Sequence, residues 1–261
     1  MDGAFAIARD LGPAGVAIIK HTNPCGAARS EESLLEAYRL ARACDPTSSF
    51  GGIVATRGEV GADFARELVE TFLEVIIAGG LTDEARDILQ AKKRLRVLVA
   101  PPAAWEMSAS PWLPRPVSGG ILLQHSDDLR QDIRSCEVVT TRQPTDEEWR
   151  AMEFGWMVVK HVKSNAIVFT RGDRTLGIGA GQMSRVDSSR IAVMKAHESL
   201  EGSAVSSDAF FPFADGIEAA AAAGATAIIQ PGGSIRDQEV IEAANKLGLT
   251  MVLTGHRHFK H

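Results

Sequence analysis

The chain has 261 residues, of which 45% are hydrophobic and 23% are charged, and its formal net charge is −5. This composition is typical of a globular protein, the length suits two small cores, and no run of about 18 uncharged apolar residues is present that could cross a membrane. Non-specific nucleic-acid binding depends on a basic surface, which a net negative charge does not favour, so no nucleic acid is expected as a partner. Without a membrane-spanning run, no membrane is expected either.

The cysteines and the N-terminus indicate the compartment. The chain does not begin with a basic segment ahead of an apolar one, so no secretory signal is expected. Its three cysteines, Cys25, Cys44 and Cys136, form no CxxC pair. An odd number without such a pair argues against a disulfide framework and against a four-cysteine zinc site. We therefore expect a protein of the reducing cytoplasm.

The first half of the sequence alternates short apolar strands with helices. The predicted strands are GVAII (15–19), GIVAT (52–56), EVIIA (74–78) and RVLVA (96–100), and the predicted helices cover 31–43, 62–73 and 83–95. Near-continuous apolar strands separated by helices are typical of a mainly parallel sheet covered on both faces. Five prolines in residues 101–116 then predict a connector that is neither helix nor strand.

The second half repeats this style without an exact sequence repeat. Thr145 and Glu148 form a capping-box signature at the start of a helix over 146–162. Further strands are predicted at 165–169, 175–179, 225–230 and 249–254, with helices that start near 184–188, at Asp215 and after the capping residue Ser234. We expect an α/β fold of two related subdomains, 1–118 and 119–261, with strand exchange between them left open.

A lysine and a histidine stand side by side at the end of the first predicted strand. Ligands gather at the carboxyl ends of parallel strands, where His21 suits a general base and Lys20 suits the stabilisation of an oxyanion. Asn23–Pro24 and Gly26 predict a tight turn directly after them. On position alone a solvated strand end is the commoner outcome, and Cys25 favours simple packing.

Further segments suit an anion or a substrate. Glycines within 176–190 open a helix and permit close backbone approach, but Gln182 breaks GxGxxG, no P-loop lysine follows, and a plain tight turn fits equally well. Residues 230–237 form a second anion-compatible junction of strand and helix. Asn165 either orients a substrate amide or caps the preceding helix. The three phenylalanines in 207–216 form either core or an aromatic wall beside a planar ring.

Zinc chemistry lacks its sequence motifs. A zinc deaminase needs H-x-E together with P-C-x-x-C, yet Pro24–Cys25 is followed by Gly26, Ala27 and Ala28. HExxH is also absent, because position 201 is glutamate. No metal ligands are therefore assigned.

Seven motifs, taken in order, closely resemble one known domain. They are KHTNPCGAA, DPTSSFGGIVA, VKSNAIVF, GIGAGQMSR, SDAFFPFADGI, IIQPGGSIRD and HRHFKH. From residue 1 to 261 the chain resembles the formyltransferase domain of the bifunctional purine-biosynthesis family that combines aminoimidazole carboxamide ribotide (AICAR) transformylase with IMP cyclohydrolase. The resemblance implies two cytidine-deaminase-like α/β/α subdomains without zinc, and a homodimer whose active sites form between subunits.

The resemblance also implies a reaction and its residues. A formyl group passes from 10-formyltetrahydrofolate to the 5-amino group of AICAR, with His21 as proton acceptor, Lys20 as oxyanion stabiliser and Asn165 orienting the substrate. By the same resemblance, AICAR is bound by Gly51, Glu74, Arg185, Phe210 and Arg257, and the folate by Val186, Asp215, Ser234 and Ile235. Some relatives carry aspartate at the position of Glu74. A potassium ion bound by backbone oxygens near 159–166 and 208 is implied as well.

The family pattern is incomplete in this sequence. Neither the cyclohydrolase domain nor the RYGxNPHQ segment, whose Arg and Tyr contact AICAR in the family, is present. We therefore expect no IMP cyclohydrolase activity from this chain. A second hypothesis is a truncated fragment that binds AICAR but is catalytically weak. A third, a deaminase-like hydrolase, predicts bound zinc.

Overall fold

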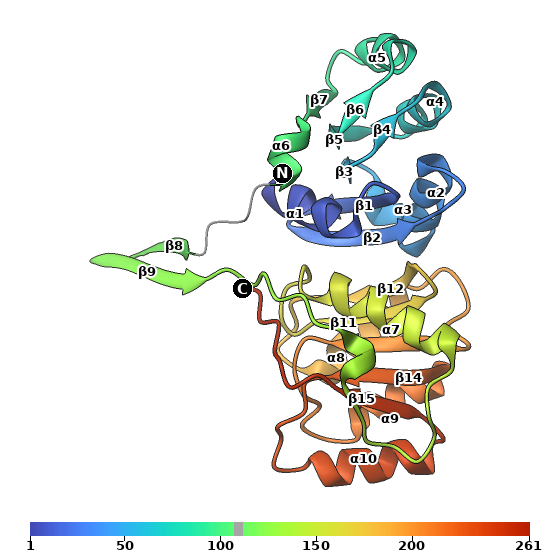
Figure 1. Cartoon of the computed structure of the whole chain (residues 1–261), viewed down its shortest axis with the longest axis vertical. Helices are drawn as coiled ribbons and strands as arrows, with labels where there is room; N and C mark the ends of the chain where they lie inside the picture. Colours follow the sequence, from blue (N-terminus) through green and yellow to red (C-terminus); the bar gives the residue numbers. More distant parts are fainter. Residues whose placement is uncertain (107–111) are drawn as a thin grey trace.

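The computed structural model describes residues 1–106 and 112–261, and within them one large sheet runs through both halves of the chain (Figure 1). Its strands are β1 (Gly15–Lys20), β2 (Asn23–Arg29), β3 (Gly52–Thr56), β5 (Leu73–Ala78), β7 (Arg96–Val99), β10 (Glu137–Val138), β11 (Ile167–Arg171), β12 (Arg174–Gly179), β13 (Ser203–Ser207), β14 (Ala225–Gln230) and β15 (Thr250–Leu253). Their spatial order is β10-β15-β14-β13-β11-β12-β2-β1-β3-β5-β7. A separate two-stranded sheet pairs β4 (Glu59–Val60) with β6 (Gly80–Leu81).

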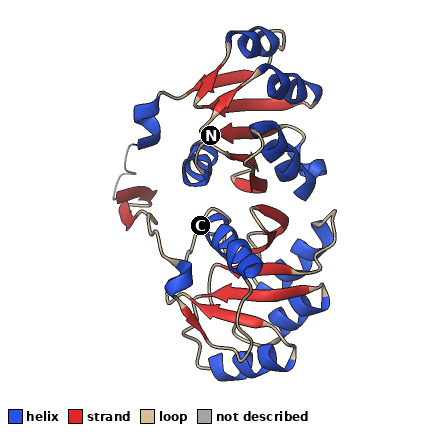
Figure 2. Ribbon diagram, turned by 45° about the vertical axis from the view of Figure 1, so that its right-hand side comes forward, coloured by secondary structure: helices blue, strands red, loops and turns tan. Residues whose placement is uncertain are grey.

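Helices cover both faces of this sheet (Figure 2). They are α1 (Asp2–Leu11), α2 (Leu34–Cys44), α3 (Pro46–Ser49), α4 (Ala62–Glu70), α5 (Asp83–Gln90), α6 (Pro102–Glu106), α7 (Asp146–Val159), α8 (Arg185–Lys195), α9 (Asp215–Ala222) and α10 (Asp237–Lys246), with a 3₁₀ turn at Ile133–Ser135. In the part of the chain that the structure describes, every helix is too short or too polar to pass through a lipid bilayer.

Strand direction changes across the sheet. The outer strands β3–β5–β7 on one side and β13–β14–β15 on the other are parallel, and helices connect them. The central strands pair antiparallel, because the hairpins β1–β2 and β11–β12 turn directly back on themselves and β2 then pairs with β12. The α/β class expected from the sequence is confirmed.

The expected turn at Asn23–Pro24 and Gly26 is wrong, because these residues lie in strand β2. The chain reverses instead at His21 and Thr22, so that Lys20 pairs with Asn23 across a two-residue turn. Gly26 serves close packing, since a Cβ there would come within 1.9 Å of the Ala41 carbonyl oxygen of α2.

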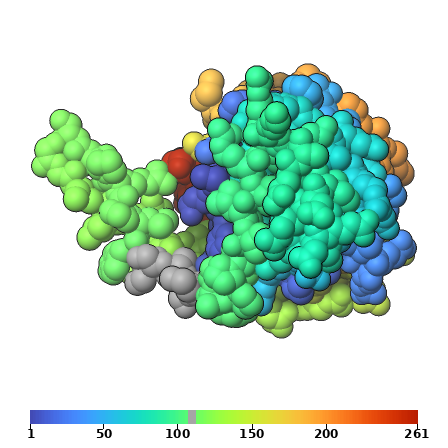
Figure 3. Space-filling view, turned by 90° about the horizontal axis from the view of Figure 1, so that it is seen from above, coloured from blue at the N-terminus to red at the C-terminus, as the bar shows by residue number. Residues whose placement is uncertain are grey.

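The connector expected over 101–116 is also partly wrong. Residues 102–106 form α6, and Trp112–Val117 form β8, which pairs with β9 (Gly120–His125) in a hairpin. Residues 107–111 lie outside the described part of the chain. The hairpin is exposed along its whole length and projects from the body of the molecule (Figure 3). The boundary proposed between residues 118 and 119 falls in its turn.

Two prolines fit strand β8 because of the hairpin register. Val117 and Gly120 close the two-residue turn, so alternate residues of β8 exchange backbone hydrogen bonds with β9. Pro114 and Pro116 occupy the other alternate positions, where the backbone nitrogen points away from the partner strand. A missing N–H therefore costs the hairpin no ladder hydrogen bond.

The core is continuous on one face of the sheet and divided on the other. Beneath α1 and α7, buried side chains from both halves form one cluster that runs from Ile19 and Ala55 to Val168 and Ile229. On the opposite face, α2, α4 and α5 cover a first-half cluster, while α8, α9 and α10 cover a separate second-half cluster. The two halves therefore share half of their hydrophobic core.

A buried polar cluster joins α1 to α7 on the shared face. Asp10 accepts from Lys160 Nζ and from His161 Nε2, both at 2.8 Å. Burial alone would raise the pKa of Asp10, but the hydrogen bond from His161 and the charge of Lys160 outweigh it and hold that pKa below its usual value. Burial lowers the pKa of His161 to about 4, although Asp10 opposes this shift. His161 is thus neutral at pH 7, and its Nε2–H donates a hydrogen bond to Asp10.

Stability is expected to fall by about 2 kcal/mol between pH 7 and pH 5 through His161. The unfolded histidine takes up a proton with a pKa near 6.5, while the folded one does so only near 4, so acid favours the unfolded chain in that window. Urea unfolding at both pH values measures the difference. The variant His161→Gln keeps a donor for Asp10 but does not titrate, so its stability should vary less with pH. An equal pH dependence in both proteins would contradict this assignment.

Candidate active site

Lys20 and His21 stand at an unusual backbone turn between β1 and β2. His21 and Thr22 both adopt the left-handed region, with φ of 48° and 68°. For a β-branched residue such as Thr22 this conformation costs on the order of 1–2 kcal/mol, so surrounding contacts must hold it. One of them is the bond from Lys20 Nζ to the Phe50 carbonyl oxygen, at 2.7 Å.

A cavity of about 390 Å³ opens beside this turn, between β2 and β12. The two strands pair at Ala28 and Arg174, after which the Thr175 hydroxyl bonds both the N–H and the carbonyl of Ala27, at 3.0 and 3.2 Å. At this position the Thr175 side chain, and not a backbone group, bonds the neighbouring strand. The cavity lies beyond it, toward the Lys20–His21 turn. Its lining comprises Lys20, His21, Asn23, Pro24, Cys25, Cys44, Asp45, Ser48, Ile178, Ala180, Gln182, Ile191, Met194 and Lys195.

An ion pair that the sequence did not suggest crosses this cavity. Lys195 Nζ of α8 bonds Asp45 Oδ2 at 2.8 Å and Ser48 Oγ at 3.2 Å, which ties the second half to the first. Burial, helped by the negative charge of Asp45, raises the pKa of Cys25 to about 11. Cys25 therefore stays a protonated thiol, which agrees with a packing role and excludes a thiolate nucleophile at neutral pH.

A buried network surrounds Asn165 in the second half. Arg185 Nη2 donates to Asn165 Oδ1 at 2.8 Å, and its Nη1 pairs with the carboxylate of Asp208. Asp208 is fully buried and also accepts from Ser164 Oγ at 2.5 Å. The amide of Asn165 donates to the Gln182 carbonyl at 2.9 Å. Asn165 is therefore an element of this network and not a cap of α7, which ends at Val159.

From the sequence, position 208 was expected only to contribute a backbone oxygen near the implied potassium ion, and the Asp208 side chain was not singled out, although it lies in the motif that begins at Ser207. The sequence around it gave little signal, because the strand before it, Ser203–Ser207, consists mostly of serines. Ser184 caps α8 by accepting from the Asp187 N–H, which sets the start of the helix and so the placement of Arg185.

The Lys20–His21 turn and the Asn165 network meet. Asn23 Oδ1 accepts from the Lys163 N–H at 2.9 Å, and Lys163 directly precedes the segment Ser164–Asn165. Gln182 bonds Asn165 and also lines the cavity beside His21. Of the residues expected to act on the reacting atoms, the structure thus brings Lys20, His21 and Asn165 into one neighbourhood.

Gly51 and Glu74 lie at the same edge of the sheet as Lys20. Gly51 has φ of 73° and donates its N–H to the Phe72 carbonyl at 2.8 Å, next to the Phe50 carbonyl that holds Lys20. Glu74, two residues after Phe72, is half exposed and pairs with Arg96 at 3.2 Å. Gly51 thus directly follows the residue whose carbonyl Lys20 bonds, and neither Gly51 nor Glu74 lines the cavity beside the turn.

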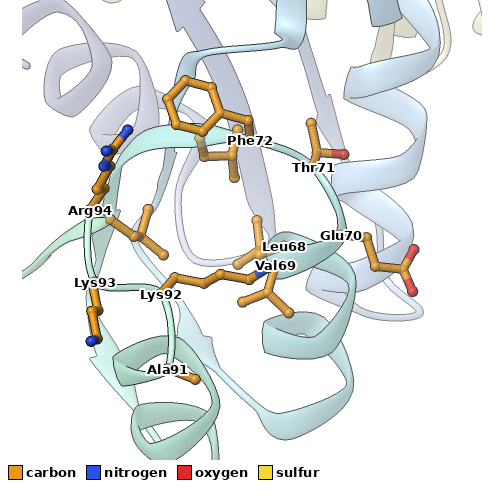
Figure 4. Close-up of a pocket in the computed structure, with 11 residues that line it drawn as sticks. Leu68, Val69, Glu70, Thr71, Phe72, Ala91, Lys92, Lys93 and Arg94 are labelled. Carbon is orange, nitrogen blue, oxygen red and sulfur yellow. The ribbon is translucent and has the colours of Figure 1, made fainter.

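A second pocket of about 410 Å³ adjoins Phe72 (Figure 4). The loop that follows α5 contributes Lys92, Lys93 and Arg94, and α4 contributes Leu68 and Val69. Figure 4 shows Lys92 extended toward Leu68 and Val69, and Arg94 close to Phe72. Three consecutive cations beside an aromatic ring suit an anionic ligand that carries a planar group.

The remaining candidates lie near the carboxyl ends of β13, β14 and β15. The Arg257 guanidinium stacks over the Phe210 ring at 4.8 Å, and the Arg236 guanidinium over Phe213 at 4.9 Å. Phe211 is fully buried core. Of the three phenylalanines, Phe211 therefore belongs to the core, whereas Phe210 and Phe213 each lie beneath an arginine.

The four candidates for the folate are spread around this end of the molecule. Asp215 Oδ1 accepts from the Gly216 N–H at 2.7 Å at the start of α9. The expected cap of α10 by Ser234 is wrong: that helix starts at Asp237, and the Ser234 hydroxyl accepts from the Arg236 N–H at 3.1 Å within the preceding loop. Ile235 is fully exposed and Val186 is half-buried on α8.

Comparison with known proteins identifies the family. Residues 1–195 match the family model described as AICARFT/IMPCHase bienzyme. The chain belongs to this family. It is 53% identical to the bifunctional purine biosynthesis protein PurH of Paracoccus denitrificans, 51% to that of Desulfitobacterium hafniense and 49% to that of Magnetococcus marinus. Each match covers 100% of this chain but only 50–51% of the relative, so the chain spans about half the length of these proteins.

The resemblance to the AICARFT/IMPCHase family is therefore confirmed. Among residues 1–106 and 112–261, no three His, Cys, Asp or Glu side chains lie together so that they could hold a metal ion. The carbonyls of Lys163, Asn165 and Asp208, near which the resemblance implies a potassium ion, each accept a hydrogen bond within the protein. A carbonyl oxygen keeps a second lone pair, so these residues fit a cation, and the potassium ion stays a prediction.

Proposed function

We propose that this chain transfers a formyl group from 10-formyltetrahydrofolate to the 5-amino group of AICAR in purine biosynthesis. The observation that carries the proposal is that hydrogen bonds connect the Lys20–His21 turn to the Asn165 network beside one cavity: Asn23 bonds Lys163, and Asn165 bonds the cavity residue Gln182. A lysine, a titratable imidazole and an oriented amide in one place suit acyl transfer to a weak amine.

The chemistry explains these residue types. The AICAR amine is conjugated with an imidazole that carries a carboxamide, so it is a poor nucleophile. As its nitrogen bonds to the formyl carbon, the bond from that carbon to the folate nitrogen breaks. The amine loses a proton and the leaving folate nitrogen takes one up, so no net proton is released. His21 accepts the proton of the amine through the neighbouring carboxamide, and Lys20 stabilises the oxyanion. Asn165, held by Arg185, orients the substrate.

The substrate groups are assigned to the surrounding residues. AICAR contacts Gly51, Glu74, Arg185, Phe210 and Arg257, and the folate contacts Val186, Asp215, Ser234 and Ile235. The partly stacked Phe210–Arg257 pair supports a planar ligand at that end. Because the family resemblance implies active sites between subunits, we propose that a homodimer completes the site. Sedimentation at increasing protein concentration tests the dimer.

An assay with AICAR and 10-formyltetrahydrofolate tests the function. The purified chain should form formyl-AICAR and tetrahydrofolate in equal amounts. It should leave formyl-AICAR uncyclised, because the motifs behind the resemblance are those of the formyltransferase domain. Tight AICAR binding without turnover would instead favour the second candidate, an AICAR-binding fragment. The match to only half the length of the PurH relatives supports that candidate.

The basic loop 92–94 is expected to bind the AICAR phosphate. Its three cations border the pocket beside Phe72, close to Gly51. Replacing Lys92, Lys93 and Arg94 together by alanine should raise the KM for AICAR by about 10- to 100-fold, because charge-assisted hydrogen bonds to the phosphate are lost. The KM for the folate should hardly change. Lys246→Ala, on the remote helix α10, is the control; an unchanged KM in the triple variant would remove the loop from the site.

A further inference from the structure

Asn23 occupies the point at which the candidate residues of the two halves meet. It is the first residue of β2 and pairs with Lys20 across the turn that contains His21. Its Oδ1 accepts from the Lys163 N–H at 2.9 Å, although 140 positions separate the two residues in the chain. Lys163 directly precedes Ser164–Asn165. One side chain therefore connects the turn to the segment that carries Asn165.

We propose that Asn23 is a positioning residue that fixes His21 relative to Asn165 during formyl transfer. The proposal rests on the proposed function of the site. The left-handed backbone of His21 and Thr22 persists only where surrounding contacts determine it. The backbone pairing of β2 with β12 is confined to Ala28 and Arg174, at the opposite end of β2, so it does not hold the turn.

Other contacts around the cavity do not replace this bond. Lys20 Nζ bonds the Phe50 carbonyl, which also belongs to the first half and so leaves the distance to Asn165 free. Lys195 and Asp45 also join the halves and line the same cavity, but the side chain of Lys195 is 43% exposed, and neither residue is next to His21 or Asn165 in the chain. Among the side-chain bonds of residues 1–106 and 112–261, the bond of Asn23 is the one whose two ends lie within two positions of His21 and of Asn165.

The variant Asn23→Ala should lower kcat by about 10- to 100-fold. A displacement of about 1 Å between reacting groups is enough for such a loss, and the acceptor for the Lys163 N–H is gone. The KM for AICAR should change by less than about threefold, because the groups proposed to bind AICAR all remain. A merely destabilising substitution would instead lower the active fraction and leave the kcat of folded molecules unchanged.

Two further variants separate positioning from general damage. Asn23→Asp keeps a side-chain oxygen that accepts from Lys163, so kcat should return to within about threefold of the wild type. Asn245→Ala removes a bond of the same kind, from the Thr141 N–H to Asn245 Oδ1 at 2.8 Å, at a remote position and should leave kcat unchanged. If Asn23→Ala retains the wild-type kcat, or if Asn23→Asp is as slow as Asn23→Ala, the proposal is wrong.

Hydrogen exchange tests the positioning independently of catalysis. The amide of Lys163 should exchange faster in Asn23→Ala than in the wild type, and at the wild-type rate in Asn23→Asp. If the wild type itself does not formylate AICAR, the proposed function fails, and this exchange result alone decides whether Asn23 holds the turn. Unchanged exchange at Lys163 in Asn23→Ala would overturn the proposal in either case.

Discussion

Replacing His21 with alanine is expected to lower the kcat for AICAR formylation by about 10²- to 10⁴-fold. The variant removes the group that takes the proton of the attacking amine. Because His21 is exposed in a two-residue turn, its side chain contributes little to packing, so the fold should survive. Steady-state kinetics with varied AICAR, together with a circular dichroism spectrum, measure both effects.

The control is a second exposed histidine that does not line the cavity beside the turn. His197 follows α8 near the surface, and His197→Ala should keep the wild-type kcat. If the His21 variant turns over AICAR as fast as the wild type, His21 is not the proton acceptor. Lys20→Ala is expected to give a loss in the same range, because the oxyanion would lose its fixed positive charge.

Replacing Asp208 with asparagine is expected to destabilise the protein by about 3–5 kcal/mol. Asp208 is fully buried and bonds Arg185, whose side chain is only 7% exposed. The substitution keeps the shape of the side chain but leaves the guanidinium as an uncompensated buried charge. Urea unfolding of the variant and the wild type at pH 7 measures the loss.

Two comparisons show whether buried charge is the cause. The exposed pair of Arg66 and Glu84 should matter little, so Glu84→Gln is expected to cost less than about 1 kcal/mol. In the double variant Asp208→Asn, Arg185→Gln, no charge is left unpaired, so it should be more stable than Asp208→Asn alone. A loss below 1 kcal/mol in Asp208→Asn would contradict a tightly coupled pair.

Sequence patterns located most of the longer helices and eight of the eleven strands that the described residues contribute to the large sheet, because local rules dominate there. The capping box of Thr145 and Glu148 is present at the start of α7, and the strands predicted at 52–56 and 225–230 have the observed bounds. Strand β13, with the sequence SAVSS, was missed because its serines and alanine carry little β propensity. Its place between β11 and β14 is a tertiary effect that local propensity does not encode.

The turn at Lys20–His21 illustrates the opposite failure. Pro24 and Gly26 are common in turns, yet β2 accommodates both, and the left-handed positions belong to His21 and Thr22, which rarely adopt them. Contacts from distant segments, such as Asn23 to Lys163, overrule the local preference. The residues proposed to act at the site were predicted from the family resemblance, and the pattern alone favoured a plain strand end.

The shared core beneath α1 and α7 limits how the chain can be divided. Because side chains of both halves pack into one cluster on that face, a half excised at the β8–β9 turn would expose a broad apolar surface to water. Neither half should be transplantable as an independent module. If the chain is cut within the exposed hairpin, the two pieces should be produced together, so that each can cover the other's bare face.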